Sequence, residues 1–336
     1  MTVRVGINGF GRIGRNFFRA AKARGADIDF VAVNDLGSLD QMALLLKRDS
    51  VAGTYPGDVK EVDGGIAVDG DVLKVVQHRD PAEIPWGDLG VDVVIESTGI
   101  FTDRDKAAAH LAGGAPRVII SAPAGGVDAT FVVGVNDDTF DPDKHVIVSN
   151  ASCTTNCFVP LIKVLDDAFG VQKGLMNTIH AYTGDQSLVD GPHKDLRRAR
   201  AAAINIVPTS TGAARATSLV LEAMKGRLDG TSLRVPIPTG SITDFTGLLD
   251  QDVTVEQVNE AFKAAASEGR LSGILQYTDE PIVSTDIVGS PYSSIFDSGL
   301  TMTMGNMVKV LSWYDNESGY SNRLVDLALV IGAANS

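Results

Sequence analysis

The chain has 336 residues, of which 44% are hydrophobic and 21% charged, and its formal net charge is −13. This length exceeds the roughly 250 to 300 residues at which single cores stop growing, so we expect two domains. The acidic balance argues against nucleic-acid binding, which requires a basic face. Charges interrupt the long apolar runs, as Glu96 interrupts VDVVIESTGIF, and the N-terminus lacks the features of a signal peptide, so we expect a cytoplasmic protein without membrane spans.

Apolar runs alternate with helical patterns through the first half of the chain. Residues 3–7 form the first run, and the RNFFRAAKARG segment after it has apolar residues at helical spacing before Gly25, a suitable C-terminal cap. TDRDKAAAHLAGG predicts another helix with Thr102 as its N-cap. Further strands are predicted at 27–35, 91–99, 117–123 and 145–151. The pattern predicts an α/β fold, with a Rossmann-type doubly wound parallel sheet domain over residues 1–152.

A glycine motif follows the first predicted strand. Gly9, Gly11 and Gly14 fit the G-x-G-x-x-G spacing, with a strand before them, a helix after them, and Asp35 at the end of the second strand. The glycines allow the backbone to approach a pyrophosphate at the helix N-terminus, and the carboxylate can accept hydrogen bonds from a ribose. The context favours dinucleotide binding over a glycine turn that binds nothing.

The second half of the chain has a different pattern of predicted strands and helices. Long strands are predicted in LMNTIHAYTG, LRVPIPTGSITDFTGLL and MVKVLSWYD, and TVEQVNEAFKAAASEG predicts a helix capped by Thr254. This pattern indicates an α+β catalytic and oligomerisation domain over residues 153–316 with a largely antiparallel sheet. The last predicted helix, about 317–336, is expected to return to the first domain.

Both cysteines lie in SNASCTTNC, at Cys153 and Cys157. A structural disulfide is unsuited to a reducing compartment, and a metal site lacks neighbouring soft ligands, so we expect no metal. Cys153 follows a predicted strand and begins a predicted helix, whose N-terminus should lower the pKa of its thiol. Cys157, followed by Phe158 and Val159, is expected to be a buried, inert thiol.

A reactive thiol requires a base, and the chain has five histidines. His180, near the end of an apolar strand and before small polar residues, is suitably placed to project into a cleft. From the residues alone, a structural or merely exposed role for this histidine remains the stronger alternative.

Six segments together carry a resemblance: INGFGRIGR, SNASCTTNC, HAYTGDQ, PHKDLRRARAAAINIVPTSTGAA, RVPIPTGS and WYDNESGYSNR. In this order the chain resembles the phosphorylating, NAD-dependent glyceraldehyde-3-phosphate dehydrogenases of the bacterial and eukaryotic type, from residue 3 to about residue 330. The resemblance implies oxidation and phosphorylation of glyceraldehyde 3-phosphate to 1,3-bisphosphoglycerate in glycolysis, with reduction of NAD. It also implies a hemithioacetal and an acyl thioester on Cys153.

The resemblance assigns roles to individual residues. Cys153 matches the nucleophile, and His180 matches the base that takes up the thiol proton and steadies the developing oxyanion. Two phosphate sites are implied: Thr183, Arg198 and Arg234 for the substrate phosphate, and Ser152, Thr154, Thr211 and Gly212 for inorganic phosphate. Besides Gly9, Gly11, Gly14 and Asp35, the implied cofactor contacts are Arg12, Ile13, Arg79, Ser121, Asn316 and Tyr320.

The resemblance also implies a homotetramer. The residues leave two other functions open, namely erythrose-4-phosphate dehydrogenase, which would use the same thiol, base and phosphate clamps, and a non-catalytic NAD-binding redox sensor that uses Cys153 as an oxidation switch. The joint presence of His180, Thr183, Arg198 and Arg234 argues against the sensor, because a sensor does not require phosphate clamps.

Overall fold

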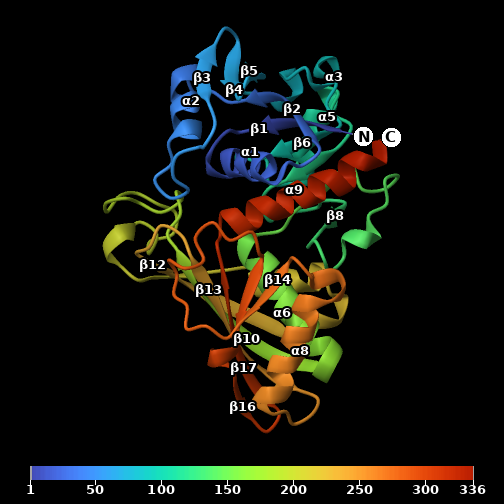
Figure 1. Cartoon of the computed structure of the whole chain (residues 1–336), viewed down its shortest axis with the longest axis vertical. Coiled ribbons are helices and arrows are strands. Elements are labelled where there is room, and N and C mark those ends of the chain that lie inside the picture. The colour runs from blue at the N-terminus through green and yellow to red at the C-terminus, as the bar shows by residue number, and fades with distance from the viewer. Residues whose placement is uncertain (1, 336) are drawn as a thin grey trace. The chain divides into compact units, whose positions relative to one another are not determined.

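The computed structural model describes residues 2–335, which divide into two compact units (Figure 1). The first unit contains the residues up to Phe131, Asn136 to Ala151, and the residues from Ser321 onward. The second contains Val132–Val135 and Ser152–Tyr320. The main division therefore falls between Ala151 and Ser152, next to the boundary expected from the sequence.

The first unit is built on a sheet with strand order β3-β4-β5-β2-β1-β6-β7-β9-β8. Its central strands, from β5 through β2, β1, β6 and β7 to β9, are parallel to one another, as the predicted fold class requires. The strands are β1 (Val3–Asn8), β2 (Ile28–Asn34), β3 (Val59–Val62), β4 (Gly65–Val68), β5 (Asp71–Val76), β6 (Val93–Glu96), β7 (Val118–Ile120), β8 (Ala129–Thr130) and β9 (Ile147–Ser149). Every residue of β6, β7 and β9 is buried, as expected for parallel strands covered on both faces.

The helices of this unit are α1 (Arg12–Arg24), α2 (Leu39–Lys47), α3 (Trp86–Leu89), α4 (Arg104–Ala107), α5 (Ala109–Ala112) and, from Ser321 onward, α9 (Ser318–Gly332). Gly25 ends α1 in the left-handed conformation, with φ of 58°, which confirms the predicted cap. The red α9 lies beside the blue α1 in Figure 1, and Arg24 binds Asp326 of α9 with a 2.6 Å ion pair.

The predicted helix after residue 102 was only partly right. The N-cap is Asp103, whose carboxylate accepts a hydrogen bond from the backbone N–H of Lys106, and Thr102 lies outside the helix. The segment also forms two short helices, α4 and α5, which meet at Ala108. Adjacent Thr and Asp are both good caps, and only the fold selects between them.

The second unit contains a mixed, largely antiparallel sheet with strand order β11-β12-β10-β13-β17-β15-β14, and β16 pairs with β17. Its strands are β10 (Val171–Ala181), β11 (Val207–Ser210), β12 (Leu228–Val235), β13 (Ser241–Leu249), β14 (Leu275–Thr278), β15 (Ser294–Asp297), β16 (Met302–Met304) and β17 (Met307–Tyr314). β10 is parallel to β12 and antiparallel to β13, so it joins the two kinds of pairing.

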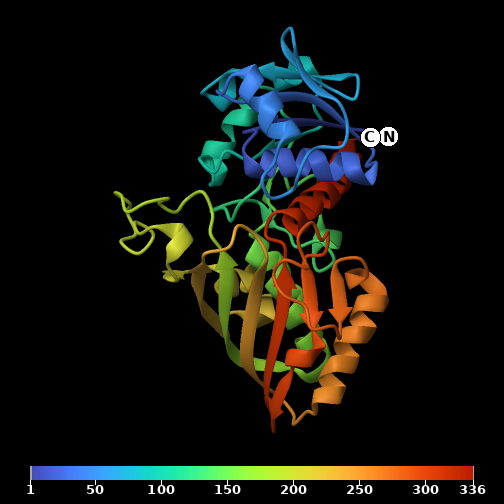
Figure 2. The same ribbon diagram turned by 60° about the vertical axis from the view of Figure 1, so that its left-hand side comes forward.

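Helices α6 (Cys153–Phe169), α7 (Ala213–Ala216) and α8 (Val255–Ser267) complete the second unit. α6 packs against β10, β13, β15 and β17, and the orange α8 lies alongside the strands of this sheet in Figure 2. Buried and more exposed residues alternate along β17, so one face of the strand belongs to the core. Thr254 caps α8 in a full capping box with Gln257, which confirms the predicted cap.

Candidate active site

Cys153 is the first residue of α6, a helix of 17 residues. Ser152 is its N-cap, and the Ser152 hydroxyl oxygen accepts a hydrogen bond from the backbone N–H of Thr155 at 3.0 Å. The thiol therefore lies at the positive end of a long helix dipole, as the sequence predicts.

β10 brings His180 to this thiol. His180 is the second-last residue of the strand and is 4% exposed, and its Nε2 lies 3.4 Å from Sγ of Cys153. The contact joins residues 27 positions apart in the sequence. His180 is therefore in hydrogen-bond contact with the candidate nucleophile, the geometry that a general base requires.

The contacts of His180 Nδ1 identify the tautomer. Nδ1 lies 2.7 Å from the carbonyl oxygen of Ala181, which can only accept, and 2.9 Å from Nη1 of Arg234, which can only donate. One nitrogen cannot satisfy both. We assign the proton to Nδ1, because the carbonyl contact is shorter and Arg234 Nη1 has acceptors at 3.1 Å in Ala181 O and Thr183 Oγ1. Nε2 is then free of its proton and faces the thiol as an acceptor.

The charge state of this pair differs from the sequence-based expectation. Burial raises the pKa of the Cys153 thiol, although the charge of Arg234 and hydrogen bonds from Thr154 oppose the shift. Burial, reinforced by the charge of Arg234, lowers the pKa of His180 to about 3. These shifts favour the uncharged thiol and imidazole over a thiolate. The lowered thiol pKa expected from the sequence is therefore wrong, because desolvation outweighs the groups that favour the thiolate.

Cys157 is fully buried, with 0% exposure, as predicted. Its sulfur lies 3.5 Å from the hydroxyl of Thr243 and 3.7 Å from that of Ser294. Burial raises its pKa to about 11, so the thiolate is scarce at neutral pH. Both cysteines are free of disulfides.

Two arginines and a threonine form a polar cluster beside His180. Arg234 donates to the hydroxyl of Thr183 at 3.1 Å, and Thr183 in turn donates to the carboxylate of Asp185. Arg198 donates to the same carboxylate and, through Nε at 2.9 Å, to the hydroxyl of Thr209. Asp185 thus links Thr183 to Arg198 directly and to Arg234 through Thr183, so it connects the three residues expected to bind the substrate phosphate.

The other phosphate-site residues are held in different ways. The buried hydroxyl of Thr154 contacts the hydroxyl of Tyr314 at 2.8 Å and is therefore directed into the protein. Thr211 accepts from the backbone N–H of Ala213 at 3.2 Å, and Gly212 precedes α7 as its N-cap.

The first unit contains a pocket of about 430 Å³ at the carboxyl ends of its parallel strands. Its lining includes four of the predicted cofactor residues: Gly9, Gly11, Asp35 and Arg79. A Cβ added to Gly11 would meet no atom within 4 Å, so this backbone faces open space that a pyrophosphate could fill. A Cβ on Gly14 would lie 2.3 Å from the carbonyl oxygen of Gly9, so only glycine fits there.

Asp35 is held ready for a ligand. Its carboxylate accepts hydrogen bonds from the backbone N–H of Phe10 at 2.7 Å and of Gly37 at 2.9 Å. These bonds fix the carboxylate at the pocket wall. Its oxygens have further lone pairs, which can accept hydrogen bonds from the hydroxyls of a ribose. The residues present therefore fit a dinucleotide.

The remaining cofactor candidates are spread over both units. Arg12 forms an ion pair with Asp49 at 2.7 Å, and Ile13 lies in the first turn of α1. Ser121 follows β7 and, like Arg12 and Ile13, is outside the lining of this pocket. Asn316 and Tyr320 belong to the second unit, where Asn316 Oδ1 accepts from the hydroxyl of Ser241 at 2.9 Å.

Sequence reasoning missed two members of the site, Asp185 and Tyr314. Asp185 follows His180 closely in HAYTGDQ, and that proximity was a usable signal. Tyr314 lies 160 positions from Thr154 and 136 from Thr178, and its hydroxyl contacts both of theirs at 2.8 Å. Only strand pairing brings such positions together.

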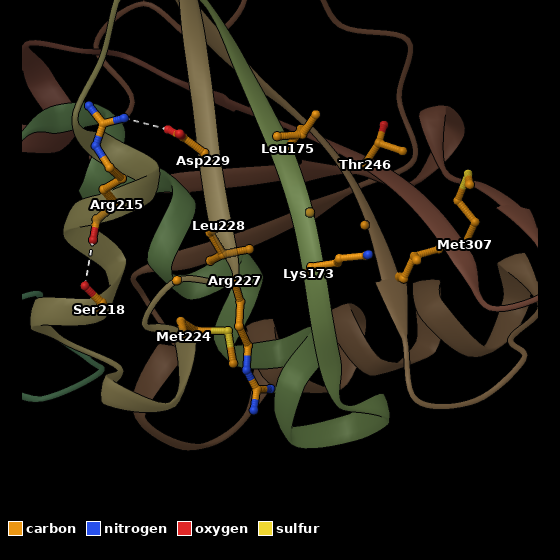
Figure 3. A pocket seen from close by; sticks show the side chains of 14 residues that line it. Lys173, Leu175, Arg215, Ser218, Met224, Arg227, Leu228, Asp229, Thr246 and Met307 are labelled. Carbon is orange, nitrogen blue, oxygen red and sulfur yellow. Dashed lines mark hydrogen bonds and ion pairs between the residues drawn. The ribbon is translucent and has the colours of Figure 1, made fainter.

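A larger pocket of about 730 Å³ lies on the sheet of the second unit (Figure 3). β10 contributes Lys173 and Leu175 to it, and Arg215 donates to Asp229 at 2.8 Å on its rim. Its lining includes neither Cys153 nor His180, so it is separate from the candidate catalytic residues.

Among residues 2–335 there is no cluster of acidic, cysteine and histidine side chains that could hold a metal ion. In the same range the structure contains no helix of the length and apolarity that a membrane crossing requires.

Comparison with known proteins identifies the family of the chain. Residues 3–104 match the model of the glyceraldehyde 3-phosphate dehydrogenase NAD binding domain, and residues 152–316 match that of the C-terminal domain of the same enzyme. Curated relatives include glyceraldehyde-3-phosphate dehydrogenase 1 of Streptomyces avermitilis, 61% identical, and glyceraldehyde-3-phosphate dehydrogenase of Mycobacterium avium, 63% identical. Each alignment covers 99% of this chain and 99% of the relative. The chain belongs to the glyceraldehyde-3-phosphate dehydrogenase family.

Proposed function

We propose that this protein is an NAD-dependent dehydrogenase that oxidises and phosphorylates glyceraldehyde 3-phosphate, with Cys153 as nucleophile and His180 as base. The observation that carries the mechanism is the 3.4 Å contact between Cys153 Sγ and His180 Nε2 at the start of α6. Family membership and near full-length relatives named for this activity support the reaction.

The first step forms a carbon–sulfur bond. His180 Nε2 accepts the thiol proton as the sulfur of Cys153 attacks the aldehyde carbon, which gives a hemithioacetal. Because the resting pair is uncharged, proton transfer creates the thiolate and the imidazolium together and leaves the net charge of the site unchanged. The imidazolium can then donate to the oxygen of the former aldehyde.

Oxidation of the hemithioacetal requires the cofactor. When bound, NAD would supply a nicotinamide that takes up a hydride. The hemithioacetal carbon on Cys153 would give up that hydride, His180 would accept the hydroxyl proton, and an acyl thioester would remain on Cys153. Gly9, Gly11, Asp35 and Arg79 would hold the adenosine and pyrophosphate portions. In the second unit, Asn316 would bind the nicotinamide amide, and Tyr320 would lie beside its ring.

The last step is attack of inorganic phosphate on the acyl thioester. A phosphate oxygen bonds to the carbonyl carbon and the carbon–sulfur bond breaks. Cys153 leaves as thiolate and recovers its proton from the His180 imidazolium formed in the oxidation step. Thr183, Arg198 and Arg234 would hold the phosphate of the substrate, and Ser152, Thr211 and Gly212 would bind the attacking phosphate. Thr154 would bind that phosphate through its backbone N–H, because its hydroxyl contacts Tyr314. A substrate phosphate would compete with Asp185 for the hydroxyl of Thr183 and the guanidinium of Arg198. At least one of the hydrogen bonds that Asp185 accepts from these two residues would therefore break when substrate binds.

The test is formation of NADH from glyceraldehyde 3-phosphate and NAD, with and without inorganic phosphate. We expect continuous turnover only with phosphate, and a single burst without it. A parallel assay with erythrose 4-phosphate identifies the competing activity, since a higher kcat/KM for that aldehyde would overturn the substrate assignment. An inactive protein that still binds NAD would instead support the redox sensor.

The proposal includes a homotetramer. On β10, Leu175 is 69% exposed and lies on the open face of the sheet. The pocket in Figure 3 lies on this same face. An apolar sheet face of this kind is suited to contact with another subunit. Light scattering at micromolar concentration should give four times the mass of 35.4 kDa.

We also propose that the protein acts in the cytoplasm. Cys153 must stay reduced to attack an aldehyde, and both cysteines are free thiols. A reducing compartment maintains that state. Fractionation of cells followed by an antibody to the protein would test the location.

A further inference from the structure

Three neighbouring strands of the first unit end in buried polar side chains. Asn34, Asn8 and Glu96 are the last residues of β2, β1 and β6, and the strand register places Asn8 opposite both of the others. Their exposures are 5%, 2% and 2%. A carboxylate removed from water is costly unless donors surround it, so the partners of Glu96 must explain its presence.

Four donors surround the Glu96 carboxylate. Oε2 accepts from Asn8 Nδ2 at 2.6 Å and lies 2.9 Å from Nε2 of the fully buried His110. Oε1 accepts from the backbone N–H of Thr98 at 2.8 Å and from the Thr98 hydroxyl. An ionised carboxylate, which only accepts, satisfies all four donors at once.

Trp86 selects the tautomer of His110. The indole Nε1 of Trp86, also fully buried, lies 3.0 Å from His110 Nδ1, and an indole nitrogen can only donate. Nδ1 therefore carries no proton, and the ring proton lies on Nε2, from which it is donated to Glu96. Trp86 thus donates a hydrogen bond to His110, and His110 donates one to Glu96.

This chain of hydrogen bonds ends in the wall of the cofactor pocket. Because Glu96 binds Asn8 Nδ2, the Asn8 Oδ1 is turned to Asn34, whose Nδ2 donates to it at 2.7 Å. Asn34 in turn brackets the backbone of His78, accepting from its N–H at 2.8 Å and donating to its carbonyl at 2.9 Å. The pocket lining includes Asn8, Thr98, Asn34 and His78, but not Glu96, His110 or Trp86.

We propose that Glu96, fixed by His110 and Trp86, is a positioning residue for NAD that sets the side chains of Asn8 and Thr98 in the pocket wall before the cofactor binds. The inference rests on NAD as the cofactor of the proposed function. A preformed pocket lowers the ordering cost of binding, so loss of the network weakens NAD affinity. The chemistry at Cys153, in the other unit, is unchanged once NAD is saturating.

The test compares His110→Leu with His110→Gln, because the two side chains are similar in size and only glutamine keeps a donor for Glu96. Titration calorimetry measures the Kd for NAD, and steady-state kinetics measure the KM and kcat values. We expect His110→Leu to raise the Kd and the KM for NAD about ten-fold, and His110→Gln to stay within about two-fold of the unmodified protein. In both variants kcat and the KM for the aldehyde stay within about two-fold.

A matched control separates positioning from general loss of stability. His145 lies in the same unit, where Nδ1 accepts from the backbone N–H of Asp141 at 2.9 Å, outside the network. His145→Leu should lower the melting temperature and leave the Kd for NAD unchanged. An equal rise in Kd for His145→Leu, or an unchanged Kd in folded His110→Leu, overturns the inference.

A further variant decides the matter if His110→Leu does not fold. Trp86→Phe removes only the indole donor, and a Kd raised about three-fold supports the network, whereas an unchanged Kd overturns it. Failure of the unmodified protein to bind NAD would overturn the proposed cofactor instead, so the two failures are distinguishable.

Discussion

At the residue scale, the two cysteines of SNASCTTNC occupy contrasting environments. Cys153 is partly exposed and contacts a base, whereas Cys157 is fully buried and its pKa is raised to about 11. Alkylation requires an accessible thiolate, so the buried thiol should react far more slowly.

One equivalent of iodoacetamide at neutral pH should therefore modify Cys153 and abolish dehydrogenase activity. Peptide mapping by mass spectrometry measures the modified residue. The control is Cys157→Ser, in which the hydroxyls of Thr243 and Ser294 can receive the new polar group, and most activity should survive. Label found mainly on Cys157, or activity that survives in Cys153→Ser, would contradict the mechanism.

Arg234 should set the pH dependence of this alkylation. Its positive charge acts to lower the pKa of Cys153 against the effect of burial, so its removal should raise that pKa further. In Arg234→Gln the midpoint of the alkylation rate against pH should move upward. Stopped-flow alkylation in the absence of substrate measures the midpoint.

Arg215→Gln provides the control for Arg234, because Arg215 is paired with Asp229 and its side chain is 63% exposed. Its midpoint should match that of the unmodified protein. A downward movement of the midpoint in Arg234→Gln would show that the guanidinium acts on the thiol mainly by other means than its charge.

At the scale of elements, helix caps show how far local sequence determines local structure. The reciprocal bonds between Thr254 and Gln257 were predictable, because both partners lie within one turn of α8. The start of α4 was not, because Thr102 and Asp103 both suit the cap and the backbone N–H of Arg104 is held by the carbonyl of Gly125, far along the chain.

Thr254→Ala should destabilise the protein by about 1 kcal/mol, because the backbone N–H of Gln257 loses its acceptor at the start of α8. Urea unfolding followed by circular dichroism measures the change. The comparison is Ser38→Ala: Ser38 is the N-cap of α2, but its side chain makes no capping bond and donates to Asp40 instead. Equal destabilisation by both variants would show that the capping box of α8 contributes no more than an ordinary surface position.

At the scale of the whole molecule, the exposed face of the second-unit sheet, which includes Leu175, should control assembly into a tetramer. Leu175→Arg places a charge on that face beside Lys173, which a dry subunit contact would have to desolvate. We expect a smaller species in multi-angle light scattering at micromolar concentration. Val72→Arg, at a 58% exposed position in the first unit, should leave the mass unchanged. An unaltered mass in Leu175→Arg would remove this face from the assembly.

Much of the molecule follows from sequence by itself. Alternation of apolar runs and helices identified the α/β first unit, because these signals are local and periodic. The glycine motif and Asp35 pointed to the pocket of the first unit, where we propose that the dinucleotide binds. The position of Cys153 at a helix start, and the burial of Cys157 one turn later, also follow from neighbouring residues.

Tertiary structure decided what depends on distant residues. The contact of His180 with Cys153 requires β10 to lie against α6, so the residues alone could not choose the base among five histidines. The lowered pKa predicted for the Cys153 thiol was wrong, because the prediction from a helix start took no account of burial by distant residues. The Trp86, His110 and Glu96 chain likewise exists only because a sheet and two short helices place their side chains together. These distances depend on how strands and helices that are far apart in the sequence pack together. The local sequence determines only which side chains are present to make the contacts.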